Sequence, residues 1–123
     1  MTLTLYGIPN CDTVKKARTW LTDHGHEFAF HDFKKHGLDA VVVRGWLAHT
    51  DWDVLVNRKG TTWRKLDDAT RAAVLDQDSA LALMLAQPSV IKRPVLAGAG
   101  VLQVGFTAGR YAALFEAAAA APA

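Results

Sequence analysis

The first third of the chain combines two short apolar runs with one amphipathic stretch. Residues 3–6 are mostly apolar and predict a short buried strand. In residues 13–24, apolar side chains recur at helical spacing, and Gly25 then predicts the end of that helix. Residues 27–31 alternate, with Phe28 and Phe30 on one face, which predicts a second strand. The pattern therefore indicates a β-α-β unit.

The middle of the chain has mainly helical spacing. Residues 38–49 favour a helix, although residues 41–43 taken alone would suit a strand. Residues 52–66 indicate a short helix followed by an irregular loop.

Two further helices are predicted before the pattern changes again. Residues 67–75 and 78–87 have helical patterns, with Asp67 and Asp78 as caps, and Pro88 predicts a stop.

The last third predicts two strands and a helix. Residues 95–97 and 101–104 are apolar runs separated by Gly98-Ala99-Gly100, which is typical of a hairpin turn. A final helix is expected after Thr107. Residues 119–123 form an Ala-rich tail that is expected to fray.

This order of elements predicts an α/β protein with a thioredoxin-like fold. We expect a four-stranded mixed sheet, with a helical insert at about residues 38–87, in a single domain over residues 1–118. The length of 123 residues and a hydrophobic content of 50% suit one domain with a substantial core.

Charge and terminal sequence exclude several classes of function. The formal net charge is only +2, and Lys and Arg alternate with Asp and Glu, so direct nucleic-acid binding is not expected. The N-terminus lacks the pattern of a secretory signal, and no apolar run is long enough to span a bilayer. A single cysteine agrees with a reducing compartment, so we expect a cytoplasmic protein without membrane contact.

The single cysteine, Cys11, is the main candidate for chemistry. It lies between the first strand and the first helix, where free backbone N–H groups and the helix dipole would favour the thiolate. Because the chain has no second cysteine, an outside thiol such as glutathione or a partner protein must resolve any oxidised form. The alternative is a buried, inert thiol.

The histidines do not predict a metal site. Their spacings match no standard zinc pattern, and only one cysteine is available. No glycine-rich loop has phosphate-binding spacing. We therefore expect no metal and no bound cofactor.

Several sequence blocks resemble one known family. Residues 5–17 read LYGIPNCDTVKKA, and this block resembles the N-terminal signature of the arsenate reductase (ArsC) and Spx family, in particular its small YffB-type branch. The blocks FHDF, NRKGTTWRKL, PSVIKRPV and VGF, which start at residues 30, 57, 88 and 104, are similar to the same branch. The resemblance covers nearly the whole chain and implies a thioredoxin-like fold with Cys11 as the redox thiol.

The resemblance also implies partners for the thiol. Cys11 matches the nucleophile of glutathione- and glutaredoxin-coupled arsenate reductases, and Arg93 matches one of their oxyanion-contacting arginines. Arg58 lies where a second such arginine is expected, although an ungapped comparison places Asn57 there. The third arginine has no counterpart in residues 103–106, and this departure weighs against arsenate as the natural substrate.

Four further residues are candidates for binding substrate or glutathione. The resemblance implies a cis peptide bond before Pro94, which would leave a backbone edge near the thiol for glutathione. Asn10 and Thr13 could hydrogen-bond the thiolate, with capping by Thr13 or Asp12 as the alternative. Lys15 could add positive potential, although a solvated helix face is its commoner role.

The expected function is that of an oxidoreductase, a glutathione-dependent thiol reductase with glutathione as cosubstrate and glutathione or glutaredoxin as its partner. The alternative is an Spx-like regulator that binds RNA polymerase without catalysis. Val14 stands where such regulators often carry a second cysteine, so an intramolecular disulfide switch is impossible. A third reading is a binding module that merely retains the thiol.

Overall fold

The structure is a computed structural model that describes residues 3–98 and 100–120. The chain forms two compact units. Unit 1 comprises Met1–His31 and Arg93–Ala123, and unit 2 comprises Asp32–Lys92.

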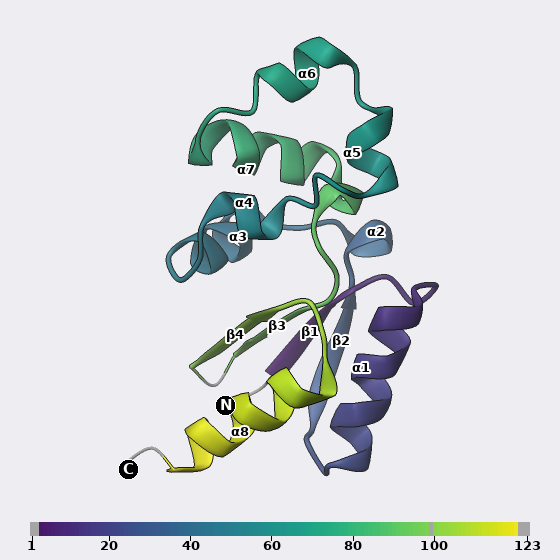
Figure 1. Cartoon of the computed structure of the whole chain (residues 1–123), viewed down its shortest axis with the longest axis vertical. Helices are drawn as coiled ribbons and strands as arrows, with labels where there is room; N and C mark the ends of the chain where they lie inside the picture. The colour runs from purple at the N-terminus through teal and green to yellow at the C-terminus, as the bar shows by residue number, and fades with distance from the viewer. Residues whose placement is uncertain (1–2, 99, 121–123) are drawn as a thin grey trace. The chain divides into compact units, whose positions relative to one another are not determined.

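Unit 1 contains the strands and the two longest helices (Figure 1). Its elements are β1 (Leu3–Gly7), α1 (Asp12–Asp23), β2 (Phe28–Asp32), β3 (Val95–Gly98), β4 (Val101–Val104) and α8 (Ala108–Ala120). The predicted β-α-β unit, the pair of strands β3 and β4 and the final helix are confirmed, and Ala99 of the predicted hairpin turn lies outside the described residues. Helix α1 ends at Asp23 with His24 as its C-cap, and Gly25 has a φ of +74°, a conformation that glycine adopts without strain.

The four strands form one mixed sheet in the order β2-β1-β3-β4. Strand β1 pairs antiparallel with β3, and β3 pairs antiparallel with β4. The remaining neighbours, β1 and β2, are joined through α1 and supply the parallel pair of the mixed sheet. The register aligns Leu5 with Leu96 and Tyr6 with Val95.

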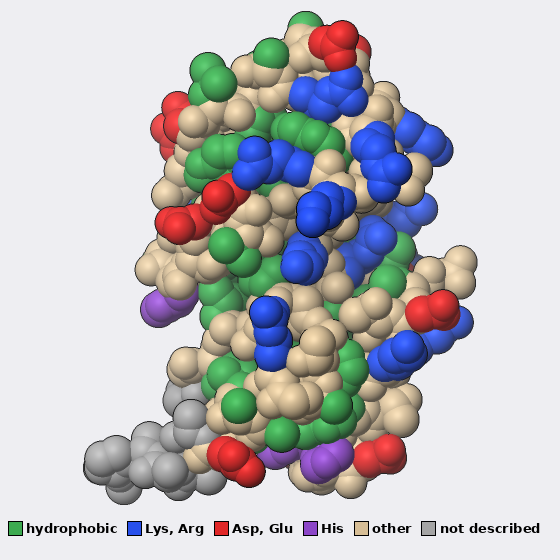
Figure 2. Space-filling view, in the orientation of Figure 1, with side chains coloured by type: hydrophobic (Ala, Val, Ile, Leu, Met, Phe, Trp, Pro, Cys, Tyr) green, Lys and Arg blue, Asp and Glu red, His purple; other side chains and the backbone are tan. Residues whose placement is uncertain are grey.

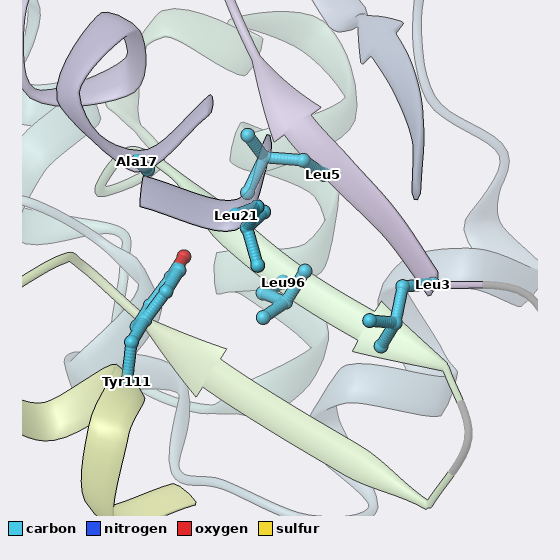
Figure 3. Close-up of a cluster of buried hydrophobic side chains, with 6 residues drawn as sticks. All are labelled: Leu3, Leu5, Ala17, Leu21, Leu96 and Tyr111. Atoms are coloured by element: carbon cyan, nitrogen blue, oxygen red, sulfur yellow. The ribbon is translucent and has the colours of Figure 1, made fainter. Parts of the chain in front are cut away.

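One face of this sheet carries the core of unit 1 (Figure 3). Alternate residues of a strand point to the same face, so Leu3 and Leu5 lie beside Leu96 and meet α1 and α8. Each fully buried side chain of this size contributes about 1.5–3 kcal/mol through removal from water. The buried cluster consists of Leu3, Leu5, Ala17, Leu21, Leu96 and Tyr111.

Unit 2 contains short helices only, apart from an isolated β-bridge between Val56 and Ile91. Helices α3 and α4 both pack against α7. In chain order the helices are α2 (Phe33–His36), α3 (Ala40–Leu47), α4 (Trp52–Leu55), α5 (Thr61–Lys65), α6 (Asp68–Ala72), α7 (Gln77–Ala86) and the 3-10 turn η1 (Pro88–Val90). The helical insert predicted at about residues 38–87 falls within this unit.

The structure corrects one predicted cap and confirms another. The cap of α7 is Asp76 and not Asp78, because the Asp76 carboxylate accepts the Ser79 N–H (2.9 Å) while the Ser79 hydroxyl accepts the Asp76 N–H (3.1 Å). At α6, the Asp67 carboxylate accepts the Thr70 N–H at 2.7 Å, as predicted.

Two short helices and one helix end also differ from the prediction. Residues 61–65 form a helix where an irregular loop was expected, residues 33–36 form a one-turn helix that was not predicted, and α6 ends at Ala72 rather than near residue 75. Each element is too short for helical periodicity to reveal it. Helix α8 continues through Ala120, into the predicted tail, and residues 121–123 of that tail lie outside the described residues.

Within the described residues, none of the helices combines the length and the apolar character that a membrane span requires.

Candidate functional site

Cys11 itself occupies the N-cap position of α1. Its backbone is extended (φ −141°, ψ 124°), and its carbonyl oxygen accepts the Lys15 N–H at 2.9 Å. The Cys11 side chain makes no capping hydrogen bond and is partly exposed. The prediction that Thr13 or Asp12 caps this helix is therefore wrong, because both residues lie inside the first turn. The thiol sits at the positive end of the helix dipole and is accessible to solvent.

A tight contact between β1 and α1 sets the position of the loop that leads to Cys11. Gly7 is buried at the end of β1, and a Cβ atom at this residue would lie 2.9 Å from Cγ2 of Val14. Val14 is fully buried in α1. Only glycine therefore allows the strand to pass this close to the first turn of the helix.

The Arg93–Pro94 peptide bond is cis, as the resemblance implied. Pro94 is buried and its carbonyl oxygen accepts the Gly105 N–H at 2.8 Å, while Arg93 is partly exposed. Both residues directly precede β3. Because Val95 pairs with Tyr6 in the antiparallel register, the start of β3 lies beside the end of β1. Arg93, Pro94 and the loop to Cys11 therefore belong to the same end of the sheet.

The other predicted binding residues of unit 1 surround the start of α1. Asn10 and Lys15 are exposed, and Thr13 is partly exposed. Residues 8–10 connect β1 to Cys11, so Asn10 immediately precedes the thiol. All three side chains are open to a bound molecule, and their contacts with one remain predictions.

Arg58 belongs to unit 2, where neighbouring side chains hold its guanidinium. The Arg58 Cζ atom lies 5.6 Å from the ring centroid of Trp52, and Nη2 lies 3.9 Å from an Asp53 carboxylate oxygen. About half of the Arg58 side chain (53%) stays exposed, so the charge remains available to an anion. The sequence carried no clear signal for the contact between Arg58 and Trp52, because a separation of six residues matches no local spacing rule.

Asn57, the alternative to Arg58, has a structural role in this structure. Its side-chain oxygen accepts the Lys59 N–H at 3.2 Å, and its carbonyl oxygen accepts the Gly60 N–H at 3.1 Å. A Cβ at Gly60 would lie 2.9 Å from Nδ2 of Asn57. Asn57 thus builds the turn from which Arg58 projects.

Gln103 belongs to residues 103–106, the segment in which the third arginine of the reductase motif has no counterpart. Gln103 lies on β4, partly exposed, and its Nε2 donates to the Val104 carbonyl oxygen at 3.3 Å. Among the described residues, no group of three or more His, Cys, Asp or Glu side chains is arranged to hold a metal ion.

Comparison with known proteins identifies the family. A model of the ArsC family matches residues 6–114. The chain belongs to the ArsC family. The solved structure of a YffB protein is 53% identical and covers 92% of this chain and 98% of its own, with a TM-score of 0.86. An arsenate reductase (ArsC) related protein from Brucella melitensis is also 53% identical, covering 94% and 96%, with a TM-score of 0.72. The predicted family and the predicted fold are thus confirmed.

The relatives of this ArsC-family chain also include proteins that are not described as arsenate reductases. An uncharacterized protein from Haemophilus influenzae is 43% identical over 113 residues, which cover 92% of this chain and 98% of the relative. The global transcriptional regulator Spx of Streptococcus pyogenes is 26% identical over 107 residues, covering 85% and 78%. The family therefore contains arsenate reductase-related proteins and transcriptional regulators.

Proposed function

We propose that this ArsC-family protein is a glutathione-dependent thiol reductase in which Cys11 forms the covalent intermediate. The observation that carries the proposal is the position of Cys11, which is partly exposed at the N-cap of α1. A thiolate is the nucleophile in thiol chemistry, and the N-terminus of a helix is the positive end of its dipole. Membership of the arsenate reductase-related family supports the same assignment.

The cations are proposed to hold the negative charge of the substrate. Arg93 offers a planar set of donors that suits a tetrahedral oxyanion or a glutathione carboxylate. Arg58 has the second such role, because its exposed guanidinium can contact an anion while Asn57 is engaged in the turn. Lys15, Asn10 and Thr13 are proposed to contact substrate or glutathione around the thiol, and Pro94 to contribute the backbone edge beside it.

The first chemical step forms a bond at the Cys11 sulfur. With a mixed disulfide as substrate, the thiolate attacks one sulfur, the S–S bond breaks, and the other sulfur leaves as a thiolate. With arsenate, the sulfur replaces one oxygen, which leaves as water after protonation. An outside thiol is needed in both cases, because the chain has no second cysteine, and we propose that glutathione supplies it.

The second step returns Cys11 to the thiolate. A glutathione or glutaredoxin thiolate attacks the Cys11 mixed disulfide, and the electron pair of the S–S bond stays on the Cys11 sulfur. For arsenate, one glutathione thiolate first attacks the Cys11 sulfur of the S–As adduct. This attack forms the mixed disulfide, and the electron pair of the S–As bond stays on arsenic, which leaves as arsenite. A second glutathione then attacks the mixed disulfide as above, so the overall products are arsenite, glutathione disulfide and water. Such a covalent intermediate predicts ping-pong kinetics.

The deciding experiment measures glutathione- and glutaredoxin-coupled reduction of arsenate, and of a glutathionylated peptide, by wild type and Cys11→Ser. Turnover that is lost only in the variant is the expected result. Equal turnover in the two proteins would contradict the role of Cys11. Turnover with the peptide alone would assign the enzyme to disulfide substrates, in line with the missing third arginine.

The second candidate is a non-catalytic regulator that binds RNA polymerase, and the similarity to an Spx regulator favours it. Stoichiometric capture of RNA polymerase by the wild type, unchanged in Cys11→Ser and accompanied by no turnover of either substrate, would support it over the reductase.

A further inference from the structure

Unit 2 carries a set of exposed cations on four segments that are separate in the sequence. The segments are α2, the turn of residues 57–60, α5 and the residue that follows Ile91. We call this set the basic surface. It consists of Lys34, Lys35, Arg58, Lys59, Arg64, Lys65 and Lys92.

Packing around η1 brings these segments together. Helices α2 and α5 both contact η1. The Asn57 N–H donates to the Val90 carbonyl oxygen at 2.8 Å, and the Lys92 N–H donates to the Leu55 carbonyl oxygen at 2.7 Å. Figure 2 shows the blue side chains gathered over the part of unit 2 where α5, η1 and α2 lie in Figure 1.

Hydrogen bonds fix part of this surface before any partner arrives. The Arg64 guanidinium donates through Nε and Nη2 to the Lys59 carbonyl oxygen, with the Nε contact at 3.1 Å. Asn57 holds the same turn from the other side through the Lys59 N–H. The turn that presents Arg58 and Lys59 is thus ordered, which lowers the entropic cost of binding.

The carboxylates of unit 2 lie mostly on other segments. Asp32 and Asp53 contact residues of the basic surface: Asp32 accepts the N–H groups of Lys34 and Lys35, and Asp53 pairs with Arg58. The others are on the helices α6 and α7 or precede α3 and α4, at Asp39, Asp51, Asp67, Asp68, Asp76 and Asp78. The nearly neutral composition of the chain therefore conceals a local excess of positive charge.

We propose that the basic surface docks a short acidic segment of a partner protein. Like charges placed side by side repel one another in the free protein, and carboxylates of a partner would relieve that repulsion. Val54, which is 45% exposed, and Trp52 lie on α4 next to Asp53, and they add apolar area of the kind found in protein interfaces.

A short protein segment fits better than a nucleic acid. Asp67 and Asp68 lie beyond Leu66, which follows α5, and they limit the length of the positive surface. A long phosphate backbone would meet these carboxylates, whereas a few carboxylates of a partner would not. Arg58 also has a role in the proposed function, so the test below measures peptide binding and leaves turnover at Cys11 aside.

The test measures binding of a labelled peptide of alternating Glu and Asp to the full chain by fluorescence anisotropy. A peptide of alternating Gln and Asn, a short DNA duplex and a short RNA strand serve as comparison probes. We compare wild type with Lys59→Glu/Lys65→Glu and with the control Lys16→Glu/Arg44→Glu. The two variants change the net charge equally, and all four residues are exposed.

We expect the acidic peptide to bind, and its affinity to fall about tenfold or more in the Lys59/Lys65 variant but less than about twofold in the control. Equal losses in both variants, tighter binding of DNA or RNA than of the acidic peptide, or binding of the neutral peptide with the same affinity would each overturn the proposal. So would the absence of peptide binding to the wild type. Circular dichroism checks the fold, and Lys59→Gln/Lys65→Gln replaces the reversal variant if that variant unfolds.

Discussion

The Trp20 and Tyr111 rings meet edge to face, with centroids 5.5 Å apart, and this contact joins α1 to α8. Phe106 meets Tyr111 in the same way, with centroids 4.6 Å apart. The Tyr111 side chain is fully buried, and its hydroxyl points toward α1 between Ala17 and Leu21 (Figure 3). Among the described residues, this hydroxyl is a buried polar group without a hydrogen-bond partner.

Replacing Tyr111 by Phe should stabilise unit 1. The substitution keeps the ring contacts and removes an unpaired hydroxyl, whose burial costs roughly 1–3 kcal/mol. We expect the free energy of unfolding in urea to rise by about 1 kcal/mol, with an unchanged m-value. Tyr111→Leu, which also removes the ring contacts, should lower it. A lower stability of the Phe variant would mean that the hydroxyl is hydrogen-bonded in solution.

Tyr111 should also make the protein sensitive to alkali. Burial raises the pKa of Tyr111 above its ordinary value of 10.0. As the pH rises, the Tyr111 hydroxyl therefore loses its proton in the unfolded chain before it does so in the folded protein. This residue leaves the free energy of unfolding independent of pH below about pH 10 and lowers it above that pH. The free energy of unfolding should fall by about 1.4 kcal/mol per pH unit from this residue alone. Urea titrations at several pH values should show that Tyr111→Phe removes this part of the slope.

Tyr6, the other tyrosine in the chain, is the matched control. Partial burial also raises the pKa of Tyr6, although the side-chain hydrogen bond with Thr4 opposes the shift. Because Tyr6 is less buried than Tyr111, Tyr6→Phe should reduce the alkaline slope less. A larger effect at Tyr6 would contradict this ranking.

Asp76 should contribute more to the stability of α7 than Asp78 does. The Ser79 N–H and hydroxyl hydrogen-bond the Asp76 carboxylate and hold its pKa below 3.8. This contribution is present above about pH 4 and disappears as the pH falls through the lowered pKa. We expect Asp76→Ala to lower the urea midpoint at neutral pH more than Asp78→Ala, and the difference should shrink in acid. Equal urea midpoints of the two variants at neutral pH would contradict the capping role of Asp76.

Gly7→Ala should destabilise the protein through Val14. The added Cβ would lie 2.9 Å from Cγ2 of Val14, and overpacking of this kind costs roughly 1–3 kcal/mol. Val14→Ala creates the missing space, so the double variant should lose less stability than the sum of the single losses. Urea unfolding of the four proteins measures the coupling, and strict additivity would show that the contact is relieved elsewhere.

Arg93→Lys should slow the proposed reductase although it keeps the charge. Lysine lacks the planar fork that binds two oxygens of an oxyanion, so we expect kcat/KM to fall about tenfold or more. Arg110→Lys, on the exposed start of α8, is the control and should leave kcat/KM unchanged. Equal rates for Arg93→Lys and wild type would remove Arg93 from the substrate site.

The candidate site was predictable where the signal was local or shared with a family. The break between residues 3–6 and the following helix placed Cys11 at a helix start. The resemblance supplied Arg93 and the cis bond at Pro94, since only about 5–6% of X–Pro bonds in folded proteins are cis. The stacking of Arg58 on Trp52 had no such signal, because it depends on how α4 and the following turn fold back on each other.

The sequence by itself determined the type and order of the longer elements, because their apolar positions repeat with a period that reports which face is buried. Tertiary structure decided what depends on other segments. Strand order and register follow from pairing between distant residues, such as Leu5 with Leu96. A hydrophobic pattern is also too coarse to resolve features that span only one or two helical turns. Hydrogen bonds and packing at that scale decide the caps at Cys11 and Asp76 and the helices at 33–36 and 61–65.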